Sequence, residues 1–261
     1  MNYPCFAGKK ILMKSFINAF LFIGITYLFL ESFIFIHHEV EEAKYIELGK
    51  KYHSLCHFPM GEGVLIDSDW VLTAGNVGND LKKDLHDGFK PKATIEAGDY
   101  EIESVTVHPD FNPTGNDIAL VKLKTPVINV TPAKLYTQNS ESGKLITIVG
   151  LKDAGDGISG PAHWDKIIRG VTNKVDGADD QWLWLDFDGP GSPGGTDMEG
   201  ISEPGEKGGP AYIDEGNTHY VAGISSHQDD NGHKKGTYGV IEYYTRVSSY
   251  AAWIQDVMNR N

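Results

Sequence analysis

Residues 70–77 of this chain read WVLTAGNV, and this stretch decides the fold. Its first four residues are apolar or β-branched, which favours a strand. A second apolar run, GVLI, precedes it at residues 63–66, and the two runs are joined by Asp67-Ser68-Asp69. Two apolar runs separated by a short polar turn predict a hairpin.

The same pattern of short apolar runs separated by turn residues continues along the chain. Residues 101–107 contain the polar and apolar alternation of a half-buried strand. More deeply buried strands are expected at residues 118–123, 145–149 and 220–224.

Only the C-terminal end has a helical pattern. Apolar side chains recur at helical spacing through residues 248–259, and Ser248 or Ser249 is a residue type that caps a helix start. Many short strands with one terminal helix predict an all-β fold of barrel or sandwich type.

The N-terminus has the layout of an export segment. A basic stretch, residues 9–14, precedes an apolar run over residues 16–36 whose single charged member is Glu31. This order is typical of a secretory signal, and the run is also long enough to span a bilayer. Residues 1–36 are therefore interpreted as a cleaved signal peptide or an uncleaved membrane anchor. Both alternatives place residues 37–261 outside the cytoplasm, in a periplasmic or extracellular compartment.

Composition argues against several classes of function. The formal net charge is -13 and no long run of Lys or Arg occurs, so a nucleic-acid partner is not expected. Cys5 and Cys56 are the two cysteines, and the first lies in the export segment, so no internal disulfide is expected. The acidic residues between 176 and 188 lack calcium-loop spacing, and the histidines near Asp229 lack a zinc pattern. We expect no metal and no cofactor.

Several segments, taken in order, resemble the trypsin/chymotrypsin family of serine proteases. They are similar to the family's W-V-L-T-A-A-H-C, H-P-x-[YF], N-D-I-A-L and G-D-S-G-G-P motifs, and they lie at residues 70–77, 108–111, 116–120 (NDIAL) and 205–210 (GEKGGP). The chain's ending, YTRV at residues 244–247 followed by Trp253-Ile254, also matches. The likeness covers residues 37–261 and is to bacterial, cysteine-poor members.

The resemblance implies a specific architecture for this domain. It implies two packed six-stranded antiparallel β-barrels of trypsin-like type, in lobes of about residues 37–143 and 144–247. A C-terminal α-helix at about residues 248–259 follows them.

The resemblance also assigns the positions of a catalytic triad, and two of them hold unsuitable residues. Asp117 stands at the carboxylate position. Asn76 replaces the histidine, and its amide cannot take up and return a proton near neutral pH. Lys207 replaces the serine, and attack by an amine would give an amide in place of a hydrolysable ester. We expect Lys207 to extend past Asn76 and form an ion pair with Asp117.

The positions around Lys207 keep the glycines of the family's motif. The backbone amides of Gly205 and Lys207 stand at the oxyanion positions and are expected to form an anion-binding nest. Glu206 replaces the family's aspartate, whereas Gly208 and Gly209 are retained near the site.

The specificity pocket is assigned to Ile201 and Ser225 by the same resemblance. A carboxylate that would select Arg or Lys is therefore absent at position 201. Trp182 and Trp184 point to the same side of a strand and are expected to be core or cleft wall.

Three functions remain open from the sequence. The leading interpretation is a pseudoprotease, an exported module that binds a protein or peptide ligand in the former substrate cleft. The second is a serine-type endopeptidase with weak or atypical hydrolysis. The third is an envelope-tethered structural or interaction domain in which the cleft has no role. In each case membrane contact is expected only through the N-terminal segment.

Overall fold

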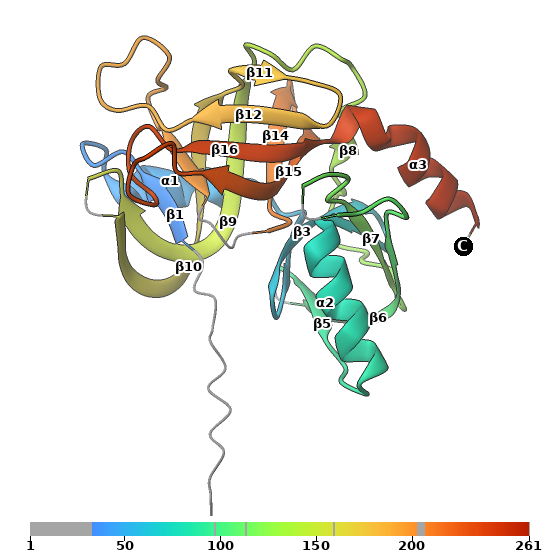
Figure 1. Ribbon diagram of the computed structural model, residues 1–261. Helices are drawn as coiled ribbons and strands as arrows, with labels where there is room; N and C mark the ends of the chain where they lie inside the picture. Colours follow the sequence, from blue (N-terminus) through green and yellow to red (C-terminus); the bar gives the residue numbers. More distant parts are fainter. Residues whose placement is uncertain (1–32, 97, 113, 159, 203–206, 261) are drawn as a thin grey trace, which may run out of the picture.

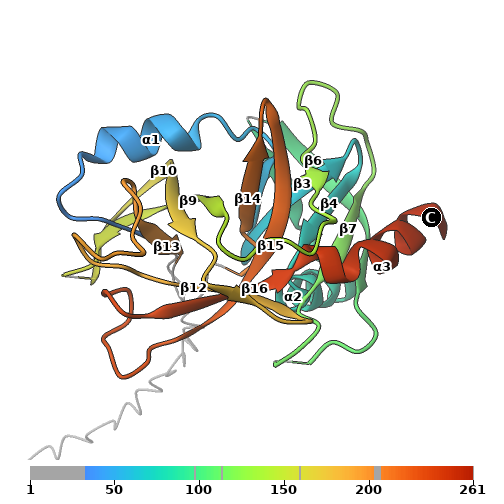
Figure 2. The same cartoon turned by 90° about the horizontal axis from the view of Figure 1, so that it is seen from above.

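Two β-lobes lie side by side, with helices on their outer surfaces (Figure 1, Figure 2). The computed structural model describes residues 33–96, 98–112, 114–158, 160–202 and 207–260. Residues 1–32, which hold most of the expected export segment, lie outside the described residues.

The first lobe is a closed barrel with the strand order β2-β3-β4-β7-β6-β5. Its strands are β2 (Leu55–Phe58), β3 (Gly61–Asp67), β4 (Trp70–Thr73), β5 (Lys92–Ile95), β6 (Gly98–Val107) and β7 (Ala119–Leu123). The hairpin expected from WVLT is confirmed, because β3 pairs antiparallel with β4. Val64, Leu72 and Leu120 are fully buried in this barrel.

The second lobe is a ten-stranded sheet with the order β11-β12-β16-β15-β14-β9-β1-β13, to which β8 and β10 add at the sides. Its strands are β1 (Phe33–Ile36), β8 (Lys134–Leu135), β9 (Leu145–Asp156), β10 (Gly160–Lys174), β11 (Gly177–Ala178), β12 (Trp182–Asp186), β13 (Gly200–Ser202), β14 (Pro210–Glu215), β15 (Thr218–Asp229) and β16 (Ile241–Arg246). The all-β, trypsin-like architecture with a C-terminal helix is confirmed. The strand count of this lobe exceeds the expected six, because short pieces such as β1, β8 and β13 join its sheet.

Strand β1 comes from the end of the run expected to be an export segment. It pairs parallel with β9 and antiparallel with β13, where Phe35 lies opposite Ile201. Ile34 and Phe35 are fully buried. The folded lobe therefore includes residues before the expected boundary at position 37, because Ile34, Phe35 and Ile36 are buried where β1 pairs with β9 and β13.

Two helices were not expected from the sequence. Helix α1 (Glu42–Gly49) packs on β10, where the buried Arg169 donates through Nε to Glu42 at 2.9 Å. Helix α2 (Gly75–His86) lies along the first barrel (Figure 1) and buries Val77 and Leu81 against it. Both are short, and their apolar residues are too few to show a helical period clearly.

The C-terminal helix α3 (Val247–Arg260) is confirmed. Because it begins at Val247, neither Ser248 nor Ser249 caps it, and the Ser248 hydroxyl donates instead to Glu141 at 2.6 Å. Buried Ile254 and Val257 join the apolar cluster of the first barrel. Among the helices of the described chain, none is long and apolar enough to cross a membrane.

Candidate functional site

Asp117 is the buried centre of the candidate site, which lies where the two lobes meet. It immediately precedes Ile118 and strand β7, and its side chain is fully removed from solvent. Its carboxylate accepts hydrogen bonds from the Asn76 backbone N–H at 3.0 Å, from Asn76 Nδ2 at 3.2 Å and from Ser226 Oγ at 2.6 Å. Three donors compensate the burial of this anion, as a buried charge requires.

Asn76 reaches Asp117 because it lies in the first turn of α2. The first backbone N–H groups of a helix have no partner inside it, and Ala74 before the helix has no side chain that can cap them. Asp117 therefore caps α2 from outside the helix. Gly75 makes room for Phe111, since a Cβ at position 75 would lie 2.5 Å from the Phe111 ring.

Lys207 lies opposite this pair at the start of the glycine segment that leads into β14. Its backbone oxygen accepts from the Glu62 N–H at 3.0 Å, and the next N–H, of Gly208, donates to the Ser225 oxygen at 2.8 Å. Gly208 has φ 90°, and a Cβ there would lie 2.1 Å from the Glu62 oxygen. These contacts fix the backbone of the former nucleophile position against the first barrel.

The expected ion pair between Lys207 and Asp117 is not formed: within the described part of the chain no ion pair joins the two residues. The physical reason is that Asn76 and Ser226 already occupy the carboxylate of Asp117. Gly205 and Glu206, the other predicted residues of the loop, lie outside the described residues.

None of the three groups around Asp117 can act as a general base toward a nucleophile. An amide and a backbone N–H do not titrate near neutral pH, and the Ser226 hydroxyl is a donor to the carboxylate. The arrangement stabilises an anion and a helix end. It lacks the imidazole that acyl transfer by this family requires.

Ile201 and Ser225, assigned above to the specificity pocket, lie next to each other in the second lobe but in different surroundings. Ile201 is fully buried in the apolar cluster around β1. The Ser225 hydroxyl is 3.1 Å from Glu242 Oε1 and 3.2 Å from the hydroxyl of Ser202.

Glu242 is a buried carboxylate that the sequence reading missed. It is 1% exposed and accepts from the Ser202 N–H at 2.9 Å as well as from both serine hydroxyls. Burial raises the pKa of Glu242 to about 6. The available signal was its position two residues before the YTRV segment, which carries the resemblance at the chain end.

Ser226 and His227 were also not assigned to the site from the sequence. The ladder between β15 and β16 pairs Ser225 with Tyr244 and His227 with Tyr243, so the register skips Ser226. Such bulges re-aim side chains near functional sites, and here Ser226 reaches Asp117. No sequence pattern marks a bulge of this kind.

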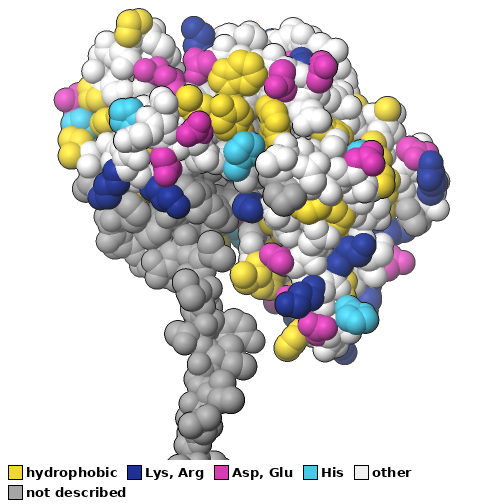
Figure 3. All heavy atoms as spheres, in the orientation of Figure 1, with side chains coloured by type: hydrophobic (Ala, Val, Ile, Leu, Met, Phe, Trp, Pro, Cys, Tyr) yellow, Lys and Arg dark blue, Asp and Glu magenta, His cyan; other side chains and the backbone are white. Residues whose placement is uncertain are grey.

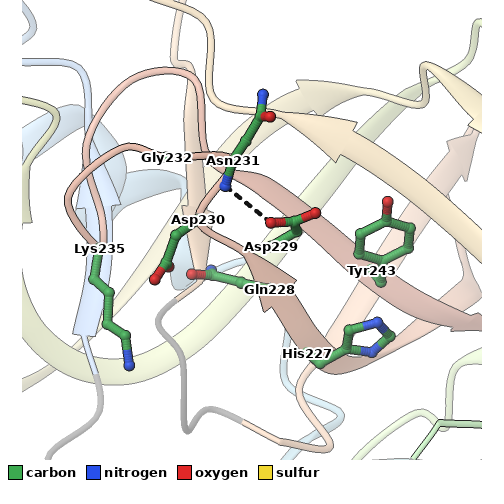
Figure 4. Close-up of a pocket in the computed structure, with 8 residues that line it drawn as sticks. All are labelled: His227, Gln228, Asp229, Asp230, Asn231, Gly232, Lys235 and Tyr243. Carbon is green, nitrogen blue, oxygen red and sulfur yellow. Dashed lines mark hydrogen bonds between the residues drawn. The ribbon is translucent and has the colours of Figure 1, made fainter.

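His227 lines an open cavity of ≈ 600 Å³ beside the site (Figure 4). The cavity is lined by His227, Gln228, Asp229, Asp230, Asn231, Gly232, Lys235 and Tyr243. The His227 ring stacks on Tyr243 with centroids 4.8 Å apart and meets the edge of Trp182 at 4.9 Å. Trp182 thus packs against His227 but is not among the residues that line the cavity.

The face of the molecule shown in Figure 3 carries charges of both signs. Basic and acidic side chains are interspersed over both lobes on the face shown in Figure 3. Among the described residues, no group of three or more His, Cys, Asp or Glu side chains is placed to hold a metal ion.

Comparison with known proteins agrees with this geometry. The family model described as Trypsin matches residues 51–178. Complement C1s subcomponent from Bos taurus is 28% identical over 236 residues, which are 77% of this chain and 32% of that protein. The Sus scrofa protein is 28% identical over 78% of this chain and 33% of its own length. This chain thus spans about a third of the length of these relatives.

A solved structure shows the same fold. Neuropsin, described as a serine protease expressed in the limbic system of mouse brain, superposes with a TM-score of 0.61 at 17% identity. The superposition covers 79% of this chain and 95% of that one. The motifs, the family match over residues 51–178 and the complement C1s relatives, together with the shared fold, support a trypsin/chymotrypsin-like serine protease family for this chain.

Proposed function

We propose that this chain is a pseudoprotease: an exported module that binds a protein or peptide segment in the former substrate cleft without cleaving it. The observation that carries the proposal is the pair of hydrogen bonds from Asn76 to Asp117. In the family's chemistry this carboxylate accepts a hydrogen bond from an imidazole, and the imidazole exchanges protons with the nucleophile. In this chain the Asn76 amide donates to the carboxylate of Asp117 instead, and Lys207 occupies the position of the nucleophilic serine.

The scaffold of the cleft is kept although the reactive groups are changed. Ser226 still donates to Asp117, and the backbone of Gly208 and Gly209 is fixed to Ser225 by hydrogen bonds of 2.8 Å. Beside it the open cavity at His227 offers room for a side chain. This geometry, with Asn76 and Lys207 at the positions of the family's histidine and serine, supports binding of a segment and argues against cleavage of peptide bonds.

Export is part of the same proposal and rests on the sequence. The basic stretch and apolar run of residues 9–36 have the layout of a secretory signal. Strand β1, which is the end of that run, pairs with β9 and β13 in the second lobe. If the segment is removed, cleavage therefore falls before β1.

The test compares the soluble domain, residues 33–261, with a restored version carrying Asn76→His, Glu206→Asp and Lys207→Ser. Both are treated with a fluorophosphonate probe, which reacts with an activated serine, and with fluorescently quenched casein. We expect no labelling and no cleavage by the natural sequence, and labelling of Ser at position 207 in the restored version. A second restored version that also carries Asp117→Asn controls for labelling that does not depend on the triad.

Binding is measured separately with fluorescein-labelled, unfolded casein by anisotropy. We expect saturable binding by the natural sequence, weakened by His227→Trp, which fills the cavity. Casein cleavage by the natural sequence that Lys207→Ala abolishes would overturn the proposal and favour an atypical endopeptidase. Absence of binding, with the restored version reactive, would favour an interaction domain that does not use the cleft.

A further inference from the structure

A hydrogen-bonded chain connects Asp117 to an imidazole other than the one the family uses. Ser226 Oγ lies 2.6 Å from Asp117 Oδ2, and His227 Nδ1 lies 3.3 Å from Ser226 Oγ. Position 76 holds Asn where the family has its histidine. The fold instead brings His227 close to the same carboxylate, with only the Ser226 hydroxyl between them. The bulge at Ser226 makes this possible, because it lets consecutive residues serve the carboxylate and the cavity.

The chain also fixes which nitrogen of His227 carries the proton. The carboxylate of Asp117 can only accept, so the single proton of the Ser226 hydroxyl is donated to it. The Ser226 oxygen must then accept from His227, which requires Nδ1–H. In the neutral ring, Nε2 is consequently left with a free lone pair.

The ring that carries this lone pair is held in place and open to ligands. Tyr243 lies parallel to it with an interplanar angle of 3°, and Trp182 meets it edge-on. His227 lines the cavity, with Asp229 and Asp230 among the residues around it (Figure 4). A general base must come within hydrogen-bond reach of the proton that it takes up, and the position of His227 on the cavity wall gives a ligand in the cavity access to the ring.

We propose that His227 is an acid–base catalytic residue for hydrolysis of small carboxylic esters in this cavity, with Ser226 and Asp117 as its positioning residues. Nε2 takes a proton from a water molecule as the water oxygen bonds to the ester carbonyl carbon. The tetrahedral intermediate then breaks its bond to the alkoxy oxygen, which receives the proton from Nε2–H. The products are a carboxylic acid and an alcohol, and the imidazole returns to its starting state.

This activity goes beyond the proposed binding function and is compatible with it. Peptide hydrolysis needs a strong nucleophile and protonation of a poor leaving group, whereas esters release an alkoxide or phenoxide more readily. Water activated by one imidazole is therefore sufficient to hydrolyse esters, whereas bound peptides are not cleaved.

The charged groups around His227 set the pH dependence. Removal of part of the ring from water lowers the pKa of His227 below its ordinary value, and the positive charge of Lys207 acts in the same direction. The negative charges of Asp117 and Asp229 oppose the shift. His227 is thus mainly neutral, and able to accept a proton, at pH 7.

The test follows hydrolysis of p-nitrophenyl acetate by the soluble domain as a function of pH. We expect the rate to rise with pH and to level off above a midpoint below about 6.5, and to be lower in D₂O. His227→Gln should lower the plateau by about 10²-fold. His233→Gln, an exposed histidine in the same β15–β16 connection, should leave the rate unchanged.

Two further variants separate positioning from folding. Ser226→Ala removes the hydrogen-bond partner of His227 Nδ1, so the rate of ester hydrolysis should fall and the midpoint of its pH dependence should move. Circular dichroism checks that the variant is folded. Lys207→Met removes a positive charge and should raise the midpoint. Equal rates for the natural sequence and His227→Gln, or a midpoint unmoved by both Ser226→Ala and Lys207→Met, would overturn the proposal. Neither result bears on casein binding, so the two proposals fail independently.

Discussion

The carboxylate of Asp117 accepts from both the backbone N–H and the side-chain amide of Asn76, at 3.0 and 3.2 Å. These two hydrogen bonds cap the first turn of α2 with a buried anion at the junction of the lobes. Asn76 stands at the position where the family has its histidine.

Asn76→Ala should therefore destabilise the domain although the residue is polar and partly exposed. The substitution removes the Nδ2 bond to a buried anion and keeps the backbone bond. We expect a loss of about 1–2 kcal/mol in the free energy of unfolding, measured by urea denaturation. Asn79→Ala, an exposed residue one turn further along α2, is the matched control and should change stability little. Equal effects of both variants would show that Asn76 does not support the helix end.

Gly208→Ala should be far more damaging than a glycine change in an open turn. Its φ of 90° disfavours a side chain, and the added Cβ would lie 2.1 Å from the backbone oxygen of Glu62. Gly216 also has a positive φ, of 63°, but nothing lies within 4 Å of its Cβ position. We expect Gly216→Ala to cost about 1 kcal/mol and Gly208→Ala to cost several times more by thermal denaturation. Similar costs would show that the segment after Lys207 moves freely away from β3.

Glu199 should make the domain less stable as the pH rises from about 4.5 to about 7. Burial raises the pKa of Glu199 from 4.5 to about 7, although Thr196 donates to its carboxylate. Between these values the folded state binds more protons than the unfolded state, so raising the pH favours unfolding. Over this window the natural sequence should lose about 3 kcal/mol relative to Glu199→Gln. Parallel stability curves for the two proteins would contradict the assignment.

Loss of the buried ion pair between Glu141 and Arg246 should be costly. Glu141 is fully buried and receives two bonds from Arg246, at 3.0 and 2.6 Å, and one from Ser248 at 2.6 Å. Removing one partner leaves a buried charge uncompensated, so Glu141→Gln should cost about 3 kcal/mol or more.

The exposed pair of Lys124 and Glu101 supplies the comparison for this prediction. It is formed at 2.7 Å, but both side chains are more than half exposed. Glu101→Gln should therefore leave the free energy of unfolding almost unchanged. A small effect of Glu141→Gln in the same urea titrations would mean that Arg246 finds another partner.

Local patterns were enough to predict several strands of both lobes. Apolar runs bounded by turn residues gave the β3–β4 hairpin, β6, β7 and the cores of β9 and β15, since a strand's burial follows directly from its side-chain alternation. They missed α1 and α2. In α2 the sequence GNVGNDLKKDLH has two glycines and only three apolar residues, and it forms a helix because Val77 and Leu81 find a barrel to cover.

By itself the sequence determined the family fold and the identity of the residues at the triad positions, because both are carried by contiguous motifs such as WVLTAGNV and GEKGGP. Only the tertiary structure decided how those residues interact. Asn76, Ser226 and Asp117 are far apart in the chain, and their three hydrogen bonds depend on how the lobes meet and on a bulge in β15. Lys207 forms no ion pair with Asp117 for the same reason: the fold places the donors of Asn76 and Ser226 on this buried carboxylate.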